Sequence, residues 1–231
     1  MRKKILCAWR YFTVGEKLLW ISSVGLILLS HFLFSGDGVL TLIASLVGVS
    51  SLLFNAKGHW FGQCLMILFS LLYGVISFSF SYYGEMITYL GMTAPMAVAA
   101  LLSWLWHPYG KGHSTVKVAR LSGRDALVML LSTLAVTVLF YFILKALHTA
   151  HLIPGTVSIA TSFLAAYLTY KRSPLFALAY AANDLVLILL WLLAAMTDPS
   201  YISVAVCFVV FLFNDMYGFL SWSRMKKSQS S

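Results

Sequence analysis

The residues of this sequence that could do chemistry are a few polar side chains set inside long apolar runs. Asn183 and Asp184 interrupt one such run, and Asn214 and Asp215 interrupt another. A buried ionisable group is costly unless it lines a cavity or meets a partner. We predict that Asn183, Asp184 and Asn214 bind a solute. The alternative for each is a packing role, through hydrogen bonds between neighbouring helices.

Aromatic side chains supply the second part of the predicted site. A flat nitrogen heterocycle stacks well on aromatic rings, with cation–π attraction if it carries positive charge. The aromatic residues that we predict to contact such a ligand are Trp60, Tyr73, Tyr89 and Trp191. Gln63 could hydrogen-bond a ribose or a base edge, or it could simply be solvated near a helix end.

Other chemistries lack their motifs. His148 and His151 lie three residues apart without a third metal ligand, and the three cysteines form no CxxC pair. The stretch from Gly110 to Thr115 lacks the GxxxxGK[ST] spacing of an ATPase. We therefore predict no metal, no cofactor and no catalytic residues. An intramembrane enzyme that uses Asp184 and Asp215 as a pair is the remote alternative, as is a membrane protein with no transport role.

Composition places these residues in a membrane. Of 231 residues, 61% are hydrophobic and 10% are charged, against about 25% charged in soluble domains. Because about 20 helical residues cross the hydrocarbon layer, the apolar runs predict about eight transmembrane helices in one transmembrane domain over residues 1–231. The predicted helices are 18–35, 39–56, 60–80, 86–106, 126–147, 154–170, 175–196 and 201–222.

The basic residues predict how the chain is oriented. If the N-terminus lies in the cytoplasm and the chain alternates sides, the cytoplasmic segments are 1–17, 57–59, 107–125, 171–174 and 223–231. These segments hold fifteen of the sixteen Lys and Arg residues, and only Lys145 falls at an outer end. Positive charge in short loops marks the cytoplasmic side. Both termini are therefore predicted to be cytoplasmic, and the net charge of +9 indicates orientation rather than a nucleic-acid partner.

Two parts of the chain resemble each other. Ile43-Ala44-Ser45 matches Ile159-Ala160-Thr161, and Leu102-Ser103-Trp104 matches Leu220-Ser221-Trp222, at offsets of 116 and 118. An even number of helices separates the copies, so both have the same orientation. The predicted fold is an all-α membrane protein with a parallel 3+1+3 repeat. Its parts are an extra helix at 18–35, a first repeat at 39–106, a linker helix at 126–147 and a second repeat at 154–222.

Over residues 38–225 the chain resembles the PnuC family of bacterial nicotinamide riboside transporters. The motifs that carry the resemblance are Ala56-Lys57-Gly58, Leu71-Leu72-Tyr73, Tyr82-Tyr83-Gly84-Glu85 with Pro95-Met96, and the stretch from Asn214 to Trp222. The resemblance implies the SWEET-like 3+1+3 architecture and facilitative uptake of nicotinamide riboside, a vitamin for NAD biosynthesis, across the bacterial inner membrane. It also implies trapping of the solute by a cytoplasmic kinase, and a homotrimer within the lipid bilayer.

The chain departs from the family's pattern at positions expected to select the substrate. Relatives tend to have Asn where this chain has Phe69, and Gln or Asn where it has Tyr89. A carrier for thiamine, riboflavin or a (deoxy)nucleoside is therefore the alternative. Because Phe69 and Asp184 occupy roughly matching places in the two repeats, the site is predicted to be asymmetric. The heterocycle would stack on the first repeat, and the second would hold its hydroxyls.

Overall fold

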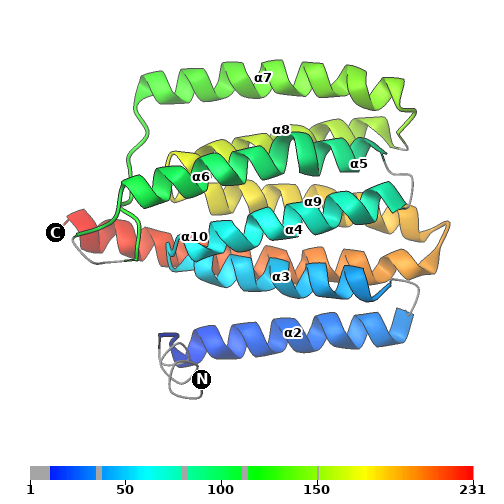
Figure 1. The fold of residues 1–231 in the computed structure, drawn as a ribbon, viewed down its shortest axis with the longest axis horizontal. Coiled ribbons are helices and arrows are strands. Elements are labelled where there is room, and N and C mark those ends of the chain that lie inside the picture. The colour runs from blue at the N-terminus through cyan, green and yellow to red at the C-terminus, as the bar shows by residue number, and fades with distance from the viewer. Residues whose placement is uncertain (1–10, 35–37, 80–82, 111–113, 150, 231) are drawn as a thin grey trace.

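A computed structural model describes residues 11–34, 38–79, 83–110, 114–149 and 151–230 of the chain (Figure 1). Four basic residues of the predicted cytoplasmic segment 1–17 lie outside these ranges, namely Arg2, Lys3, Lys4 and Arg10. The elements are α2 (Val14–Phe34), α3 (Val39–Ala56), α4 (Phe61–Ser79), α5 (Tyr83–Thr88), the π-helix η1 (Tyr89–Thr93), α6 (Ala94–Trp106), α7 (Gly123–Ala146), α8 (Leu152–Tyr170), α9 (Leu175–Ala195), the 3₁₀ helix η2 (Pro199–Tyr201) and α10 (Ile202–Ser230).

Among the described residues, eight helices are long and apolar enough to cross a membrane, which confirms the predicted all-α membrane fold. The segment α5, η1 and α6 forms one of the eight, and η2 with α10 forms another. The last helix continues past the predicted end at residue 222 to Ser230. Gln229 explains part of this extension, because its side chain accepts from the Val118 N–H and donates to the Val116 carbonyl.

Six of the spans pack into a closed ring. Each helix in the sequence α3, α4, α6, α8, α9 and α10 packs against the next, and α10 packs against α3. The two remaining helices, α2 and α7, lie outside the ring on opposite sides (Figure 1). In each repeat the second helix, α4 or α9, lies between the other two. Contacts between the repeats join the first helix of one to the third helix of the other, as a parallel two-fold arrangement requires.

Two tryptophans mark the axis that relates the repeats. Trp104 in α6 donates its indole N–H to the Thr169 carbonyl at the end of α8, at 2.9 Å. Trp222 in α10 donates to the Asn55 carbonyl at the end of α3, at 2.7 Å. The two rings contact each other with centroids 5.4 Å apart. Each repeat thus places the Trp of its third helix on the last turn of the other repeat's first helix.

The turns that follow α3 and α8 are alike as well. Gly58 and Arg172 both have left-handed backbone angles, with φ of 63° and 56°. In each case the next residue donates its N–H back to the helix, from His59 to Phe54 and from Ser173 to Leu168, both at 3.0 Å. Such a left-handed residue satisfies the last free carbonyl groups of a helix. The preceding residues, Lys57 and Lys171, therefore occupy equivalent positions.

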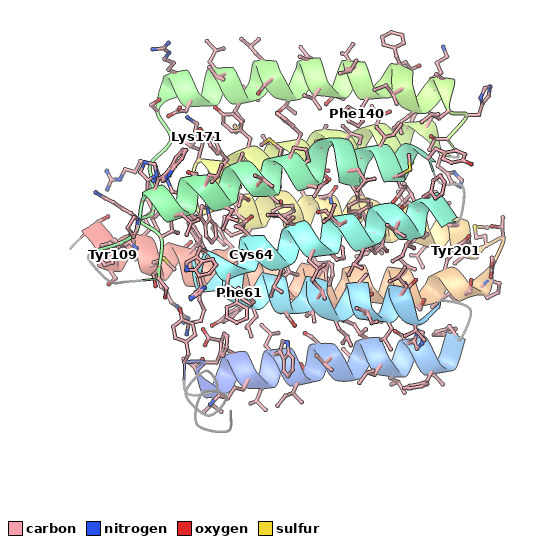
Figure 2. The ribbon with its side chains drawn as sticks, in the orientation of Figure 1. Phe61, Cys64, Tyr109, Phe140, Lys171 and Tyr201 are labelled. Atoms are coloured by element: carbon pink, nitrogen blue, oxygen red, sulfur yellow. The ribbon has the colours of Figure 1, made fainter. Side chains whose placement is uncertain are left out.

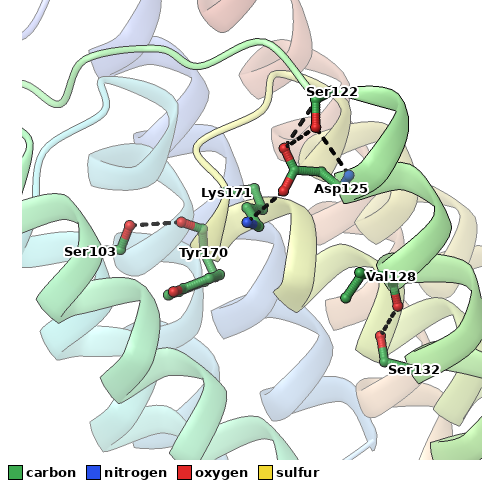
Figure 3. A network of polar contacts seen from close by, with 7 residues as sticks. All are labelled: Ser103, Ser122, Asp125, Val128, Ser132, Tyr170 and Lys171. Atoms are coloured by element: carbon green, nitrogen blue, oxygen red, sulfur yellow. Dashed lines mark hydrogen bonds and ion pairs between the residues drawn. The ribbon is translucent and has the colours of Figure 1, made fainter.

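These two lysines connect α2 and α7 to the ring in the same way. Lys57 forms an ion pair with Glu16 in the first turn of α2, at 3.0 Å, and Lys171 forms one with Asp125 in the first turn of α7, at 2.7 Å (Figure 3). Each acid also belongs to a capping box, with Thr13 in α2 and with Ser122 in α7. The predicted extra helix and the predicted linker helix thus have matching places, and the two halves correspond over four helices each.

The basic segments gather at one end of the bundle, which we call the basic end. The loop after α6 pairs with the turn after α3 through a bridge between His59 and Thr115, and Ala119 donates its N–H to the Arg172 carbonyl. The start of α2 and the end of α10 lie at this end (Figure 1). Figure 2 shows Tyr109 and Lys171 here and Tyr201 at the opposite end.

Candidate substrate-binding site

A cavity of about 440 Å³ lies within the ring of six helices. Its volume falls in the range of small-molecule pockets, roughly 300–1,000 Å³. Helices α3, α4, α8, α9 and α10 and the α5–η1 segment contribute to its lining, and so does Leu144 near the end of α7. Loop residues of the opposite end also line it, among them His148, Thr149 and Thr197, whereas the turns of the basic end do not. The cavity therefore extends toward the opposite end of the bundle.

The first repeat lines the cavity with aromatic rings. Phe69 of α4 is 5% exposed, and its ring lies edge-on to Tyr89 of η1 with centroids 6.0 Å apart. Tyr73 lies behind them, 4.8 Å from the Tyr89 ring. Phe211 of α10 joins this group at 5.9 Å from Phe69. The result is an apolar, aromatic wall suited to a flat ring.

The π-helical turn explains how Tyr89 reaches this wall. Pro95 has no N–H to continue the α-helical pattern, and the Ala94 N–H instead bonds the Tyr89 carbonyl five residues before it. Such turns interrupt a helix locally and occur often at functional sites. Here the turn is at the level of the cavity, so Tyr89 is buried within it rather than facing lipid.

The second repeat supplies a polar wall with a fixed amide. The side-chain oxygen of Asn183 accepts hydrogen bonds from three hydroxyl groups of α8, those of Ser158 at 3.1 Å, Thr161 at 2.9 Å and Ser162 at 3.0 Å. Because these donors use the oxygen, the other polar group that Asn183 can present is its NH₂. The polar residues of the short sixth span therefore hold this amide in one orientation.

Two carboxyl groups complete the polar wall, and Glu85 of α5 adds a third carboxyl group to the cavity lining. Asp184 of α9 and Asp215 of α10 are 4% and 5% exposed, and both line the cavity. Their side chains are hydrogen-bonded to each other. Apart from this contact, the Oδ2 atom of Asp184 has no hydrogen-bond partner in the described part of the chain. No Lys or Arg is found among the described residues that line the cavity.

The structure brings four of the eight predicted site residues together around this cavity, namely Tyr89, Asn183, Asp184 and Trp191. Tyr73 lies in the second row, against Tyr89. Trp60 stacks on His59 at the basic end, with centroids 5.5 Å apart. Gln63 is buried and donates to the Asn55 side-chain oxygen at 2.9 Å. Asn214 donates to Ser23 of α2, at 2.9 Å, and to the Val210 carbonyl.

Several lining residues were missed by the sequence reasoning. The main one is Asp215, which faces the cavity while its neighbour Asn214 faces α2. Ser158 and Ser162 are also missing from the predicted set, although their spacing of four residues places them on one helical face. That spacing, within a helix that carries several Ser and Thr residues, is the signal that could have found them.

The arrangement defines a helical membrane carrier with one internal solute cavity between two like-oriented halves. The family model described as "Nicotinamide mononucleotide transporter" matches residues 38–224. The chain belongs to this family, and it is a transporter rather than an enzyme. The alternative of a catalytic Asp184–Asp215 pair is thereby set aside.

Two individual proteins support this assignment. The chain is 22% identical, over 233 residues, to the "Nicotinamide riboside transporter PnuC" of Neisseria mucosa, covering 99% of this chain and 87% of the relative. A solved structure titled "Crystal structure of the Vitamin B3 transporter PnuC" matches with a TM-score of 0.80 and 22% identity, over 94% of each chain. At that identity the structural match shows a shared fold.

Proposed function

We propose that this protein is a facilitative carrier that moves nicotinamide riboside across the bacterial inner membrane into the cytoplasm. The observation that carries the proposal is the cavity of about 440 Å³ with an aromatic wall on one side and an amide and carboxyl wall on the other. Nicotinamide riboside combines a flat, positively charged ring with ribose hydroxyl groups. The ring suits the wall around Phe69 and Tyr89, and the hydroxyls suit Asn183 and the carboxyl pair.

The charge of the lining favours the riboside over the phosphorylated mononucleotide. A phosphate group needs Arg, Lys or a helix N-terminus to replace its hydration. The described lining has three carboxyl groups, those of Glu85, Asp184 and Asp215, and no Lys or Arg, so a phosphate would be repelled there. Thiamine also has a flat cationic ring, and it is the second substrate to test.

The closed basic end supports an alternating-access cycle. Beneath the cavity, Gln63, Asn55 and Ser51 form a buried hydrogen-bonded group, and Trp222 covers the end of α3. The cavity extends only toward the opposite end. With the termini in the cytoplasm, this is an outward-facing state, and uptake requires the contacts at the basic end to open.

The transport experiment uses purified protein in liposomes with labelled nicotinamide riboside. For a facilitator, we expect uptake to stop at equal concentrations on both sides and to be unaffected by proton or sodium gradients. Liposomes that contain the mononucleotide or thiamine instead test selectivity. Accumulation above equilibrium under a proton gradient would contradict facilitation, and absence of riboside uptake would contradict the proposed substrate.

The orientation rests on the basic residues collected at one end of the bundle, which we propose faces the cytoplasm together with both termini. In a variant with Cys7, Cys64 and Cys207 replaced by Ala, a single cysteine at the exposed position Ser114 should resist membrane-impermeant labelling in intact cells. Labelling without lysis would reverse the orientation. We also propose a homotrimer, on the family resemblance, which the mass of the detergent-solubilised protein tests.

A further inference from the structure

The carboxyl pair in the cavity differs from the other acidic groups of the described chain. Glu85 of α5 also lines the cavity, but its side chain is partly exposed, unlike those of the pair. Glu16 and Asp125 each form an ion pair with a lysine at the basic end. Asp198 is exposed and caps η2 through the Ser200 N–H. Asp184 and Asp215 are more than nine-tenths buried, and neither forms an ion pair within the described residues. Burial of acidic groups without a cation needs a separate explanation.

A purely structural role for the pair leaves one atom unexplained. A hydrogen bond between two carboxyl groups contains one proton, so the bonded pair carries at most one negative charge. Apart from that contact with Asp215, Asp184 Oδ2 has no hydrogen-bond partner in the described part of the chain. Buried polar atoms in native proteins are nearly always hydrogen-bonded, and exceptions call for a specific reason. An atom of this kind in the lining of a cavity indicates a ligand.

The opposite wall indicates which kind of ligand. The faces of aromatic rings attract cations, and Phe69, Tyr89 and Phe211 form an aromatic wall of the same cavity. A ligand with a positively charged ring would meet aromatic side chains on one side and a negative charge on the other. A neutral ring of the same shape would gain the stacking but would leave the carboxylate uncompensated.

We propose that Asp184 and Asp215 are the residues that make this carrier select a cationic heterocycle over a neutral one of the same shape. This inference rests on the proposed function and names what determines its specificity. Asp184 lies on α9 and Asp215 lies on α10. The selecting pair therefore forms only when these two helices of the second repeat pack against each other. Phe69 and Tyr89 of the first repeat, with Phe211 of the second, contribute ring contact, and the carboxyl pair of the second repeat contributes charge.

The test compares two ligands that differ mainly in charge. Nicotinamide riboside carries a pyridinium cation, whereas its dihydro form has a neutral ring and the same ribose. Calorimetric titration of the purified, unmodified protein should show tighter binding of the cation by about ten- to a hundredfold, as expected for a charged hydrogen-bonding partner. Asp184→Asn and Asp215→Asn should each lower this ratio toward one, mainly by weakening the binding of the cation.

A matched control is Asp125→Asn, which removes an acidic group outside the cavity and should leave the ratio unchanged. A thermal melt of each variant shows whether it is folded. If a variant does not fold, the comparison of the two ligands on unmodified protein still decides the proposal. Equal affinity for the two forms would overturn the charge-selection proposal, and so would an unchanged ratio in both folded variants. Neither result would contradict the proposed transport function. Binding of neither form would overturn the proposed substrate instead.

Discussion

The two halves of the molecule are built alike at the basic end and differently at the level of the cavity. At the basic end, Trp222 and Trp104 make the same hydrogen bond to the opposite half, and Lys57 and Lys171 make the same ion pair. In the cavity, the first half presents Phe69, whereas the second presents Asp184 at the position 115 residues further on. Repetition therefore fixes the scaffold, and divergence on α4 and α9 creates an asymmetric site.

The two equivalent ion pairs at the basic end also differ in how deeply they are buried. The Glu16 and Lys57 side chains are 5% and 18% exposed, whereas those of Asp125 and Lys171 are 31% and 32% exposed. In α2, Glu16 has a further partner, because Tyr217 of α10 donates to it at 3.0 Å. Helix α2 is thus attached to the ring by a buried polar group, and α7 by an exposed ion pair. Equivalent positions should therefore contribute unequally to stability.

The largest effect is expected from the tryptophans on the axis. Trp222→Ala and Trp104→Ala remove side chains that are 0% and 2% exposed, and each should lower the free energy of unfolding by about 3–5 kcal/mol. Thermal or denaturant unfolding in detergent measures this. The variants Trp222→Phe and Trp104→Phe keep one aromatic ring but lose the N–H and part of the indole volume, so each should cost more than about 1 kcal/mol and less than the Ala variant. If one tryptophan costs much more than its counterpart, the equivalence of the two halves at this end is wrong.

The next effect concerns the buried ion pair. Lys57→Met leaves Glu16 without its cation and should cost about 3 kcal/mol, the lower end of the usual range for a broken buried pair. The lower end is expected because the Tyr217 hydroxyl and the Thr13 N–H still donate to Glu16. The same unfolding measurement applies, and the double variant Lys57→Met with Glu16→Gln should recover part of the loss. A single variant as stable as the unmodified protein would contradict the role assigned to burial.

A smaller effect is expected on the polar wall of the cavity. Asn183→Leu removes the acceptor shared by three hydroxyl groups of α8, and it should cost about 1–3 kcal/mol of stability. Ser132→Ala is the control, because Ser132 bonds only carbonyls of its own helix on α7 (Figure 3) and should change stability by less than about 0.5 kcal/mol. Equal melting temperatures for both variants would mean that the Asn183 amide is not needed to order α8.

The smallest effect concerns the exposed ion pair. Asp125→Asn should cost less than about 1 kcal/mol, and added salt should reduce that cost further. The hydrogen bond to Asp125 raises the pKa of Lys171 above its ordinary value of 10.5. A raised lysine pKa gives stability that is present below the unfolded value and lost only as the pH rises through the folded one. Titration of Lys171 should therefore leave the effect of the substitution unchanged between about pH 6 and about pH 9. A cost equal to that of Lys57→Met would remove the contrast between the halves.

The sequence by itself determined the class of fold, the spans and the gathering of basic segments, because these depend on properties that add up along the chain. Apolar length marks a span wherever it falls, and the matching offsets of the Ile-Ala-Ser/Thr and Leu-Ser-Trp segments reveal two like-oriented halves. Asp184 could be singled out for the same reason, since a carboxyl group in the middle of an apolar helix needs a cavity or a partner in any fold.

Only the tertiary structure decided which polar residues share the cavity. Asn214 and Asp215 are adjacent and point about 100° apart on one helix, so the sequence requires that they face different neighbours but does not name them. The position of α2, whose Ser23 accepts from Asn214, turns Asp215 toward the cavity. The place of Gln63 likewise depends on another helix. Its side-chain amide donates to Asn55 of α3, so Gln63 packs at the basic end. Contacts between helices are set by how the whole bundle packs, and no local pattern in the chain encodes them.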